Sequence, residues 1–211
     1  MKNLLIIGSG GHAKSVIDAA EANGNYFIIG LVDDFEPVGT KKHGYDVLGG
    51  IDGIKSVVSR SHDKPLLHIA VGNNKDRNDI FNRLNLDSSL FATIIHPTAY
   101  VSKHAAIGYG VFLGAYGFVN AGTTINNFCI VNTRSSLDHD CTMMPFSALA
   151  PSVTCAGYVK IGKGSQISTG ATLANKVTIG NCCIIGGGSF VKNDVLSDTF
   201  GYGVPFEAKT T

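Results

Sequence analysis

The sequence predicts an α/β domain over residues 1–94, followed by an all-β domain with the coiled architecture of a parallel β-helix over residues 95–211. Two periodicities support this division. In the first segment, short apolar runs alternate with segments of helical pattern, which is typical of a small parallel sheet with helices on its faces. In the second segment an aliphatic residue recurs every six residues, which suits a chain that turns a corner at that interval.

The α/β segment is expected to fold as a Rossmann-like half. We expect strands at residues 4–7, 27–32, 66–71 and 91–95, and helices at residues 12–23, 51–60 and 74–86. A sheet of four strands is half of a full dinucleotide-binding fold, and no hydride-transfer domain follows it. The segment is therefore predicted to hold one nucleotide, and the chain is not expected to be a dehydrogenase.

The all-β segment keeps one phase over its whole length. Three flats of six residues would close a triangular coil of 18 residues, so about five coils are expected to stack through parallel strands. The first column is aliphatic apart from Met143 and Cys155 and consists of Ile95, Val101, Ile107, Leu113, Val119, Ile125, Val131, Leu137, Met143, Leu149, Cys155, Ile161, Ile167, Leu173, Ile179, Ile185 and Val191. A second column, whose small or β-branched side chains let the prism close, includes Ala105, Val111, Thr123, Cys129, Ser147, Val153, Val177 and Ser189.

The composition indicates a core-forming protein with a small partner. Hydrophobic residues make up 44% of the chain, charged residues make up 16%, and the net charge is +1. Neither a nucleic acid nor an anionic membrane is therefore expected as a partner. The N-terminal apolar run is too short for a signal peptide or a membrane span, so a cytoplasmic location is predicted. The five cysteines form no CxxC pair, which favours buried thiols over disulfides or a zinc site. No acyl-enzyme is expected, because Cys129, Cys141 and Cys183 fall on the small inward column and Cys155 falls on the aliphatic one.

A glycine loop lies between the first predicted strand and the first predicted helix. The segment GSGGHAK matches G-x-G-x-x-A, where glycines let backbone N–H groups and a helix N-terminus approach a phosphate closely. Acids at the end of the second strand commonly accept hydrogen bonds from a ribose. The loop alone is also consistent with a tight turn that binds no ligand. For a nucleotide-sugar, we expect the pyrophosphate near Gly10, Gly11 and His12, and the nucleoside near Asp33 and Asp34.

The third predicted strand ends in GNNKDR. Gly72 lies at the carboxyl end of this strand, where ligands of open α/β sheets bind, and it is included in the predicted substrate site. Asn73, Asn74 and Arg77 are equally well explained as a helix cap and a solvated first turn. Three other histidines are not expected to bind substrate: His68 is predicted to pack within its strand, and His43 and His62 are predicted to lie on the surface.

Seven motifs follow one another from Ile7 almost to the C-terminus: IGSGGHAK, LVDDF, IAVGNN, IHPTA, LDHDC, CAGYVKIG and IIGGGSFVKN. Together with the repeat, they resemble the hexapeptide-repeat acyltransferases, in the branch that contains bacterial sugar-nucleotide N-acetyltransferases of the bacillosamine and perosamine type and their sialic acid O-acetyltransferase relatives. The resemblance implies a left-handed parallel β-helix, a homotrimer, and acetyl-CoA in the groove between neighbouring prisms. It also implies that the N-terminal domain holds the nucleotide part of the acceptor.

The segment LDHDC places a histidine on a predicted corner. With Leu137 pointing inward, His139 and Asp140 come third and fourth in their hexad, where side chains should face outward. Gly157 follows one coil later, so it is expected about 4.8 Å below His139 with its N–H open to a ligand. Acetyl transfer from a thioester to an amine needs a base and an N–H donor for the oxyanion. The resemblance assigns the carboxylate that orients the ring to Asp140, and Asp138 remains an alternative.

The resemblance also implies that acetyl-CoA contacts Thr169 and Gly187. These two residues are 18 positions apart and should stack on a corner different from that of His139. A different corner is expected if the cofactor lies between two subunits. Relatives often have a histidine where this chain has Ala148, which leaves open how the acetyl donor or the substrate is recognised in detail.

The resemblance and these residues together predict an acetyl-CoA-dependent N-acetyltransferase that acts on the amino group of a nucleotide-linked deoxyamino sugar. Attack is expected to be direct, with His139 as general base and without a metal. Two alternatives stay open: an O-acetyltransferase of a sialic-acid-like sugar, and a non-catalytic trimeric protein that binds a sugar nucleotide. The sequence does not distinguish UDP from GDP and does not identify the sugar or the position of its amine.

Overall fold

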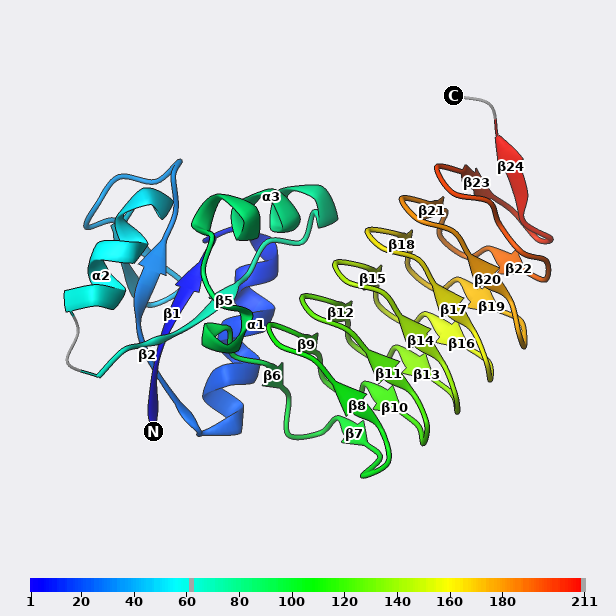
Figure 1. The fold of residues 1–211 in the computed structure, drawn as a ribbon, viewed down its shortest axis with the longest axis horizontal. Coiled ribbons are helices and arrows are strands. Elements are labelled where there is room, and N and C mark those ends of the chain that lie inside the picture. The colour runs from blue at the N-terminus through cyan, green and yellow to red at the C-terminus, as the bar shows by residue number, and fades with distance from the viewer. Residues whose placement is uncertain (61–62, 210–211) are drawn as a thin grey trace.

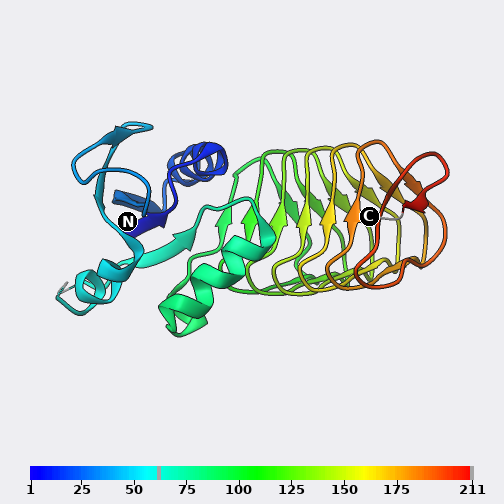
Figure 2. The same ribbon diagram turned by 90° about the horizontal axis from the view of Figure 1, so that it is seen from above.

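The computed structural model describes residues 1–60 and 63–209, so the prediction for His62 lies outside the described residues. The molecule consists of an α/β part at the N-terminal end and a prism of stacked coils that extends to the C-terminus (Figure 1). Seen from above, helix α3 (Asn74–Leu84) lies beside the coils of the prism (Figure 2). The two parts therefore meet along an extended junction.

The α/β part is built around a five-stranded sheet in the order β3-β4-β2-β1-β5. Strands β1, β2, β4 and β5 run parallel, while β3 pairs antiparallel with β4. The predicted sheet of four strands is wrong in number, because the polar hairpin that contains β3 and β4 lacks the long apolar run from which a strand is predicted. The elements are β1 (Lys2–Ile7), α1 (Gly11–Asn23), β2 (Tyr26–Val32), β3 (Lys41–Lys42), β4 (Tyr45–Gly49), η1 (Ile51–Gly53), α2 (Ile54–Arg60), β5 (Leu66–Ile69), α3 and η2 (Ser88–Leu90).

The predicted strand at residues 91–95 is wrong as a member of this sheet. Phe91 makes only an isolated parallel bridge with Leu67. Ile94 and Ile95 instead form β6, which pairs with β9 (Phe112–Leu113) in the prism. The apolar run resembles a single strand because Phe91 packs in the core of the α/β part, whereas Ile95, four residues later, packs against the core of the prism.

The prism is a parallel β-helix of two-residue strands stacked in three sheets. One sheet, β22-β19-β16-β13-β10-β7, has six strands, so the prism has close to six coils where about five were predicted. Neighbouring strands such as β10 and β13 pair residues 18 positions apart, which confirms the predicted repeat. At the C-terminal end, β23 (Phe200–Tyr202) pairs with β21 and with β24 (Glu207–Lys209). The remaining strands are β7 (Tyr100–Val101), β8 (Ala106–Ile107), β10 (Phe118–Val119), β11 (Thr124–Ile125), β12 (Ile130–Val131), β13 (Ser136–Leu137), β14 (Thr142–Met143), β15 (Ala148–Leu149), β16 (Thr154–Cys155), β17 (Lys160–Ile161), β18 (Gln166–Ile167), β19 (Thr172–Leu173), β20 (Thr178–Ile179), β21 (Ile184–Ile185) and β22 (Phe190–Val191).

Both predicted columns fill the interior of the prism. The aliphatic column is buried from Leu113 to Val191, and the small column is buried beside it. Hydroxyl groups in the small column donate hydrogen bonds to carbonyls near the next coil, as Thr123 Oγ1 does to the Asp138 carbonyl at 2.7 Å. Such bonds satisfy polar atoms that the core would otherwise leave unpaired. The Thr123 bond also supports the corner that carries His139.

The corners of the prism use the left-handed backbone region at a fixed position. A positive φ recurs every six residues from Gly110 to Gly188, and it includes Asp140 at 58° and Cys182 at 54°. This conformation turns the chain sharply, so the side chain at that position points away from the core. Cys182 is therefore exposed, against the prediction that all thiols are buried, whereas Cys129, Cys141, Cys155 and Cys183 are buried as predicted.

A buried arginine joins the two parts of the molecule. Arg77 is only 1% exposed and donates from Nε to the Phe128 carbonyl at 2.8 Å and from Nη2 to the Phe146 carbonyl at 3.0 Å, both on the prism. Its Nη1 donates to the carbonyls of Val71 and Gly72 in the α/β part. The expectation of a solvated first turn is therefore wrong for Arg77, because backbone carbonyls of both parts replace water around its guanidinium.

Asn74 completes this junction. Its buried amide nitrogen donates to the carbonyls of Gly164 and Ser165 on the prism at 3.1 and 3.2 Å. Asn73, in contrast, caps α3 as predicted, because its side-chain oxygen accepts the Asp76 N–H at 3.0 Å. One face of the first turn of α3 is thus a docking surface, while the preceding residue serves the helix alone.

Candidate active site

The His139 corner places an imidazole and a carboxylate in contact. Nδ1 of His139 lies 2.8 Å from Oδ2 of Asp140, where the ring N–H donates to the carboxylate. Oδ1 of Asp138 instead accepts the backbone N–H of His139 at 2.8 Å and the Asn120 amide at 2.7 Å. Of the two carboxylates that the sequence leaves open, Asp140 therefore contacts the ring, and Asp138 fixes the backbone beneath it.

The left-handed backbone of Asp140 explains this geometry. At a φ of 58° the chain folds back after His139, which brings the short Asp140 side chain to the Nδ1 edge of the ring. The carboxylate of Asp138 is committed to its own partners, since the hydrogen bond from Asn120 and then the N–H of His139 lower its pKa. With Nδ1 held by Asp140, the lone pair of Nε2 is available on the opposite edge of the ring.

The ring of His139 lies directly against Gly157. A Cβ atom at position 157 would stand 2.7 Å from both Cε1 and Nε2 of the imidazole, so only glycine leaves room for the ring. The ring of Tyr158 meets the imidazole edge to face, with centroids 5.0 Å apart at 89°. The side chain of His139 remains 44% exposed. Within the described chain, the N–H of Gly157 donates to no protein acceptor.

Thr169 and Gly187 stack on another corner, between β18 and β19 and between β21 and β22. The N–H of Gly188 donates to the Thr169 carbonyl at 2.9 Å, and both Thr169 and Gly187 are exposed. Their own N–H groups have no acceptor among residues 1–60 and 63–209. The structure thus separates these residues from His139, which lies on the corner between β13 and β14.

The glycine loop borders a cavity of about 470 Å³. It lies where β1, β2 and β5 end, because parallel strands of one sheet have their carboxyl ends at one edge. α1 begins at the cavity, and within the described residues its first turn has no side-chain cap and no acid, so its first N–H groups are not capped by the helix itself. All the predicted substrate residues line the cavity, namely Gly10, Gly11, His12, Asp33, Asp34 and Gly72.

The two aspartates predicted from the sequence, Asp33 and Asp34, already have protein partners, and Asp76 and Asp79 of α3 also line the cavity. Oδ2 of Asp33 accepts hydrogen bonds from the N–H and the hydroxyl of Ser9, at 2.8 and 2.7 Å. Oδ1 of Asp34 accepts the Ile51 N–H at 2.8 Å, and its Oδ2 pairs with Arg83. Arg83 lines the cavity and is absent from the sequence-based prediction, since a lone arginine at the end of a helix gives no signal of its own. The Ser9–Asp33 bonds hold the glycine loop in place, and the Asp34 contacts join the end of β2 to η1 and α3.

His12 lies in an apolar setting at the inner end of the cavity. Burial, the neighbouring His68 and the Arg77 guanidinium lower its pKa to about 3, so the imidazole is neutral. Its ring stands edge-on to Phe112 with centroids 5.0 Å apart, and its buried Nε2 has no hydrogen-bond partner among the described residues. His12 therefore contributes shape to the cavity and carries no positive charge.

Other histidines have structural contacts. His68 is buried in β5 as predicted, with Nδ1 at 2.8 Å from the Ala92 carbonyl, and burial lowers its pKa to about 4. His43 was predicted on the surface but is half-buried, because its Nε2 lies 2.8 Å from the Ser9 carbonyl of the glycine loop. It therefore helps to hold that loop.

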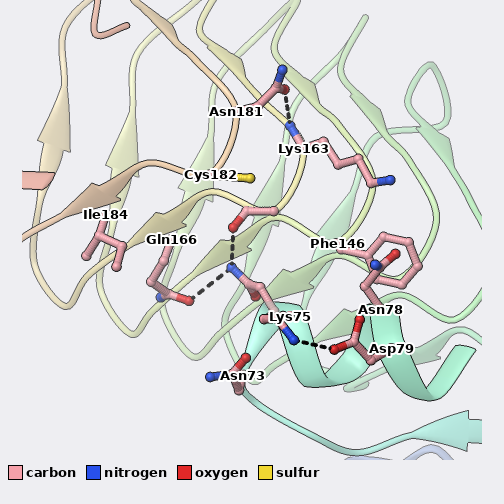
Figure 3. Close-up of a pocket in the computed structure, with 12 residues that line it drawn as sticks. Asn73, Lys75, Asn78, Asp79, Phe146, Lys163, Gln166, Asn181, Cys182 and Ile184 are labelled. Carbon is pink, nitrogen blue, oxygen red and sulfur yellow. Dashed lines mark hydrogen bonds and ion pairs between the residues drawn. The ribbon is translucent and has the colours of Figure 1, made fainter. Parts of the chain in front are cut away.

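A second cavity, of about 770 Å³, lies between α3 and the prism (Figure 3). Asn73 and the Lys75–Asp79 ion pair come from the helix side, and Phe146, Lys163 and Cys182 come from the prism side. Nζ of Lys163 lies 5.9 Å from the centre of the Phe146 ring. The predicted site residues lie elsewhere, so this cavity has no part in the site that the sequence predicts.

Two kinds of feature are absent from the described residues. No group of three or more His, Cys, Asp or Glu side chains in this part of the chain could hold a metal ion. None of the helices in the same residues has the length and apolar character needed to cross a membrane.

Comparisons with known proteins match both parts of the chain. Residues 3–84 match the family described as the PglD N-terminal domain, and residues 158–193 match the family described as bacterial transferase hexapeptide (six repeats). The GDP-perosamine N-acetyltransferase of Escherichia coli is 28% identical over 178 residues, which cover 82% of this chain and 78% of that protein.

Two solved structures share the whole fold. The acetyltransferase domain of PglB from Neisseria gonorrhoeae, in complex with acetyl coenzyme A, is 32% identical with a TM-score of 0.90, over 99% of each chain. PerB from Caulobacter crescentus, in complex with CoA and GDP-perosamine, is 30% identical with a TM-score of 0.91, over 100% of this chain and 98% of that chain. The order of the two parts is the same in all three molecules.

Proposed function

Because the chain belongs to the hexapeptide-repeat acyltransferases of the sugar-nucleotide N-acetyltransferase branch, we propose that it transfers the acetyl group of acetyl-CoA to the amino group of a nucleotide-linked deoxyamino sugar. The observation that carries this proposal is the His139–Asp140 pair, with the Nε2 edge of its ring lying against Gly157 on an open corner. The binding of CoA and GDP-perosamine by a relative of the same fold supports the same choice of substrates.

The corner supplies the groups for direct attack. Asp140 holds the Nδ1 proton, so Nε2 of His139 can take a proton from the sugar amine as the nitrogen attacks the thioester carbonyl. The new C–N bond forms while the carbonyl electrons move to oxygen, and the N–H of Gly157 is proposed to stabilise that oxyanion. The C–S bond then breaks, and the imidazolium returns its proton to the CoA thiolate. Asp140 stabilises the imidazolium in between.

The glycine-loop cavity is the proposed site for the nucleotide. The uncapped first turn of α1 offers N–H groups to a pyrophosphate near Gly10 and Gly11. In the part of the chain that the structure describes, Oδ1 of Asp33 accepts only the Phe35 N–H, so this oxygen can accept a further hydrogen bond from a ribose hydroxyl. His12, which is neutral, is proposed to shape the cavity beside the pyrophosphate without attracting it by charge.

The separation of the two corners favours a homotrimer with acetyl-CoA between subunits. His139 of one subunit and Thr169 and Gly187 of the next would then face one groove. The sheet next to the His139 corner carries the outward rings of Tyr100 and Phe118, which stack with centroids 5.0 Å apart and remain 53% and 39% exposed. A second copy would cover this apolar face. Because a relative that is similar over most of the chain is a bacterial sugar-nucleotide N-acetyltransferase, we propose that the reaction takes place in the cytoplasm.

The alanine at position 148 affects how the acceptor can be recognised, because it removes a polar side chain from that face of the prism. It is 3% exposed and packs with Phe112 and Ile130 against the α/β part, so this chain has an apolar contact where relatives often carry an imidazole. The acceptor in this protein is therefore proposed to be positioned by the glycine loop more than by the face of the prism.

A panel of acceptors tests the proposal. The purified chain is incubated with acetyl-CoA and with UDP- and GDP-linked amino sugars or sialic-acid-like hydroxy sugars, and the thioester absorbance is followed. We expect consumption with at least one amino sugar and an N-acetyl product by mass spectrometry. Reaction with hydroxylated acceptors alone would make the chain an O-acetyltransferase, and no consumption with any acceptor would favour a binding protein without catalysis.

A further inference from the structure

Asn175 lies one coil beyond Gly157 on the corner that carries His139. These three residues are 18 positions apart in succession, so they share one place in the repeat. A Cβ atom built at Gly157 would stand 3.2 Å from the amide nitrogen of Asn175 and 2.7 Å from Nε2 of His139. The amide and the imidazole therefore flank the same point beside Gly157.

Two other asparagines at the same place in their hexads show what such a residue does when it is structural. The side-chain oxygen of Asn127 accepts the N–H of Tyr109 at 2.9 Å, and that of Asn181 accepts the N–H of Lys163 at 2.8 Å. In both cases the acceptor caps the N–H of the residue one coil earlier. The corresponding bond from Asn175 would cap the N–H of Gly157.

That bond is not made. The side chain of Asn175 forms no hydrogen bond with the described protein, and it is exposed. The N–H of Gly157 likewise has no acceptor in the described chain. Two N–H donors, on Gly157 and on the Asn175 side chain, therefore have no protein acceptor in the described chain beside Nε2 of His139. The hydrogen bond that Asn127 and Asn181 make at their own corners would have paired the N–H of Gly157.

We propose that the side-chain amide of Asn175 donates a hydrogen bond to the thioester carbonyl oxygen and, with the N–H of Gly157, stabilises the tetrahedral oxyanion. This inference rests on the proposed acetyl transfer. The oxygen gains its negative charge as the sugar amine forms the C–N bond and Nε2 of His139 takes the amine proton. It loses that charge when the C–S bond breaks and the CoA thiolate takes the proton back. A donor aimed at this oxygen acts on the transition state more than on the bound substrates.

The test compares Asn175→Ala and Asn175→Asp with Asn193→Ala in the full chain. Asn193 occupies the same place one coil farther on and serves as the matched control. Removal of one oxyanion donor typically lowers kcat by about 10²-fold or more, and for an exposed side chain we expect about 10- to 100-fold. The KM values for acetyl-CoA and for the best acceptor of the panel should stay within about threefold, because the lost interaction belongs to the transition state. Asn193→Ala should match the wild type.

The Asn175→Asp variant distinguishes the loss of the hydrogen-bond donor from a change in the size of the side chain. Asp keeps the size of Asn but presents an anion to the developing oxyanion, so Asn175→Asp should be at least as slow as Asn175→Ala. An unchanged or faster rate in either variant, or a raised acceptor KM with kcat retained, would overturn the role of Asn175.

The same measurements distinguish this inference from the proposed function. If the wild type acetylates only hydroxylated acceptors, N-acetylation fails, while the kcat ratio of the Asn175 variants still decides the oxyanion role on the same thioester. If no acceptor of the panel makes the wild type consume acetyl-CoA, both ideas are overturned together.

Discussion

The His139 corner and the glycine-loop cavity are both polar, but they use their polar atoms differently. At the corner, His139 is half-exposed, and one nitrogen of its ring has no partner in the described chain. In the cavity, Asp33 is bonded to Ser9 and Asp34 to Arg83, so these carboxylates mainly hold the protein itself. The corner therefore leaves its side chains free for reacting atoms, whereas the cavity uses side chains to present backbone N–H groups.

This difference predicts different consequences of mutation. Substitutions at the corner should change turnover and leave stability almost unchanged, because little is buried there. Substitutions in buried polar groups behind the cavity should change stability first, because they leave buried backbone atoms unpaired. Arg77 is such a group, since it donates to the carbonyls of the lining residues Val71 and Gly72. Measuring kcat and the free energy of unfolding for each variant therefore tests whether the two regions differ in this way.

The largest effect on turnover is expected for His139→Ala. Loss of a general base lowers kcat by about 10²- to 10⁴-fold, while the free energy of unfolding should change by less than about 0.5 kcal/mol, as for most surface positions. Steady-state consumption of acetyl-CoA and urea unfolding measure the two quantities. His104→Ala serves as the control, because His104 is an exposed histidine on an earlier corner and should keep the wild-type rate. If His139→Ala turned over at the wild-type rate, the imidazole would have no place in the mechanism.

The opposite pattern is expected for Arg77→Met. The substitution keeps much of the buried volume but removes the donors to the carbonyls of Phe128, Phe146, Val71 and Gly72. Buried acceptors left unpaired make this a loss of about 3 kcal/mol in the free energy of unfolding, measured by urea denaturation. The kcat of the folded fraction should stay within about threefold, since Arg77 does not touch the corner.

Arg83→Met is the matched control for this junction. Arg83 lies on the same helix and makes two ion pairs, with Asp34 and Asp52, but its side chain is 43% exposed. Solvent screens such pairs, so the loss of stability should be much smaller than for Arg77→Met. Equal losses in the two variants would show that the buried carbonyl contacts do not set the stability of the junction.

The sequence predicts the corner and the lining of the cavity better than it predicts the junction between the two parts, for a physical reason. In the prism, the position of Gly157 beside His139 follows from the strict repeat of 18 residues, and only the reach of Asp140 depends on its left-handed backbone. In the α/β part, Arg77 meets carbonyls on residues 51 and 69 positions away, and no local pattern indicates such partners. The same limit applies to the hairpin of β3 and β4, whose residues carry little apolar signal.

Acid should weaken the α/β part in a way that depends on His12. The folded pKa of His12 is about 3 against its ordinary 6.5, and that of His68 is about 4. The unfolded chain therefore binds more protons between these values, so stability is complete above pH 6.5 and falls as the pH drops below it. Each buried histidine contributes a slope of about 1.4 kcal/mol per pH unit in that window.

His12→Leu should remove one of these two slopes. Because Nε2 of His12 has no hydrogen-bond partner in the described chain, the substitution breaks no hydrogen bond of that atom there. Urea unfolding at pH 8, where both imidazoles are neutral in both states, gives the baseline for each protein. Unfolding at pH 6, 5.5 and 5 should then show a shallower decline for His12→Leu than for the wild type. An identical decline would mean that His12 accepts a proton in the folded state as readily as in the unfolded chain. The cavity would then present a positively charged imidazole to the pyrophosphate.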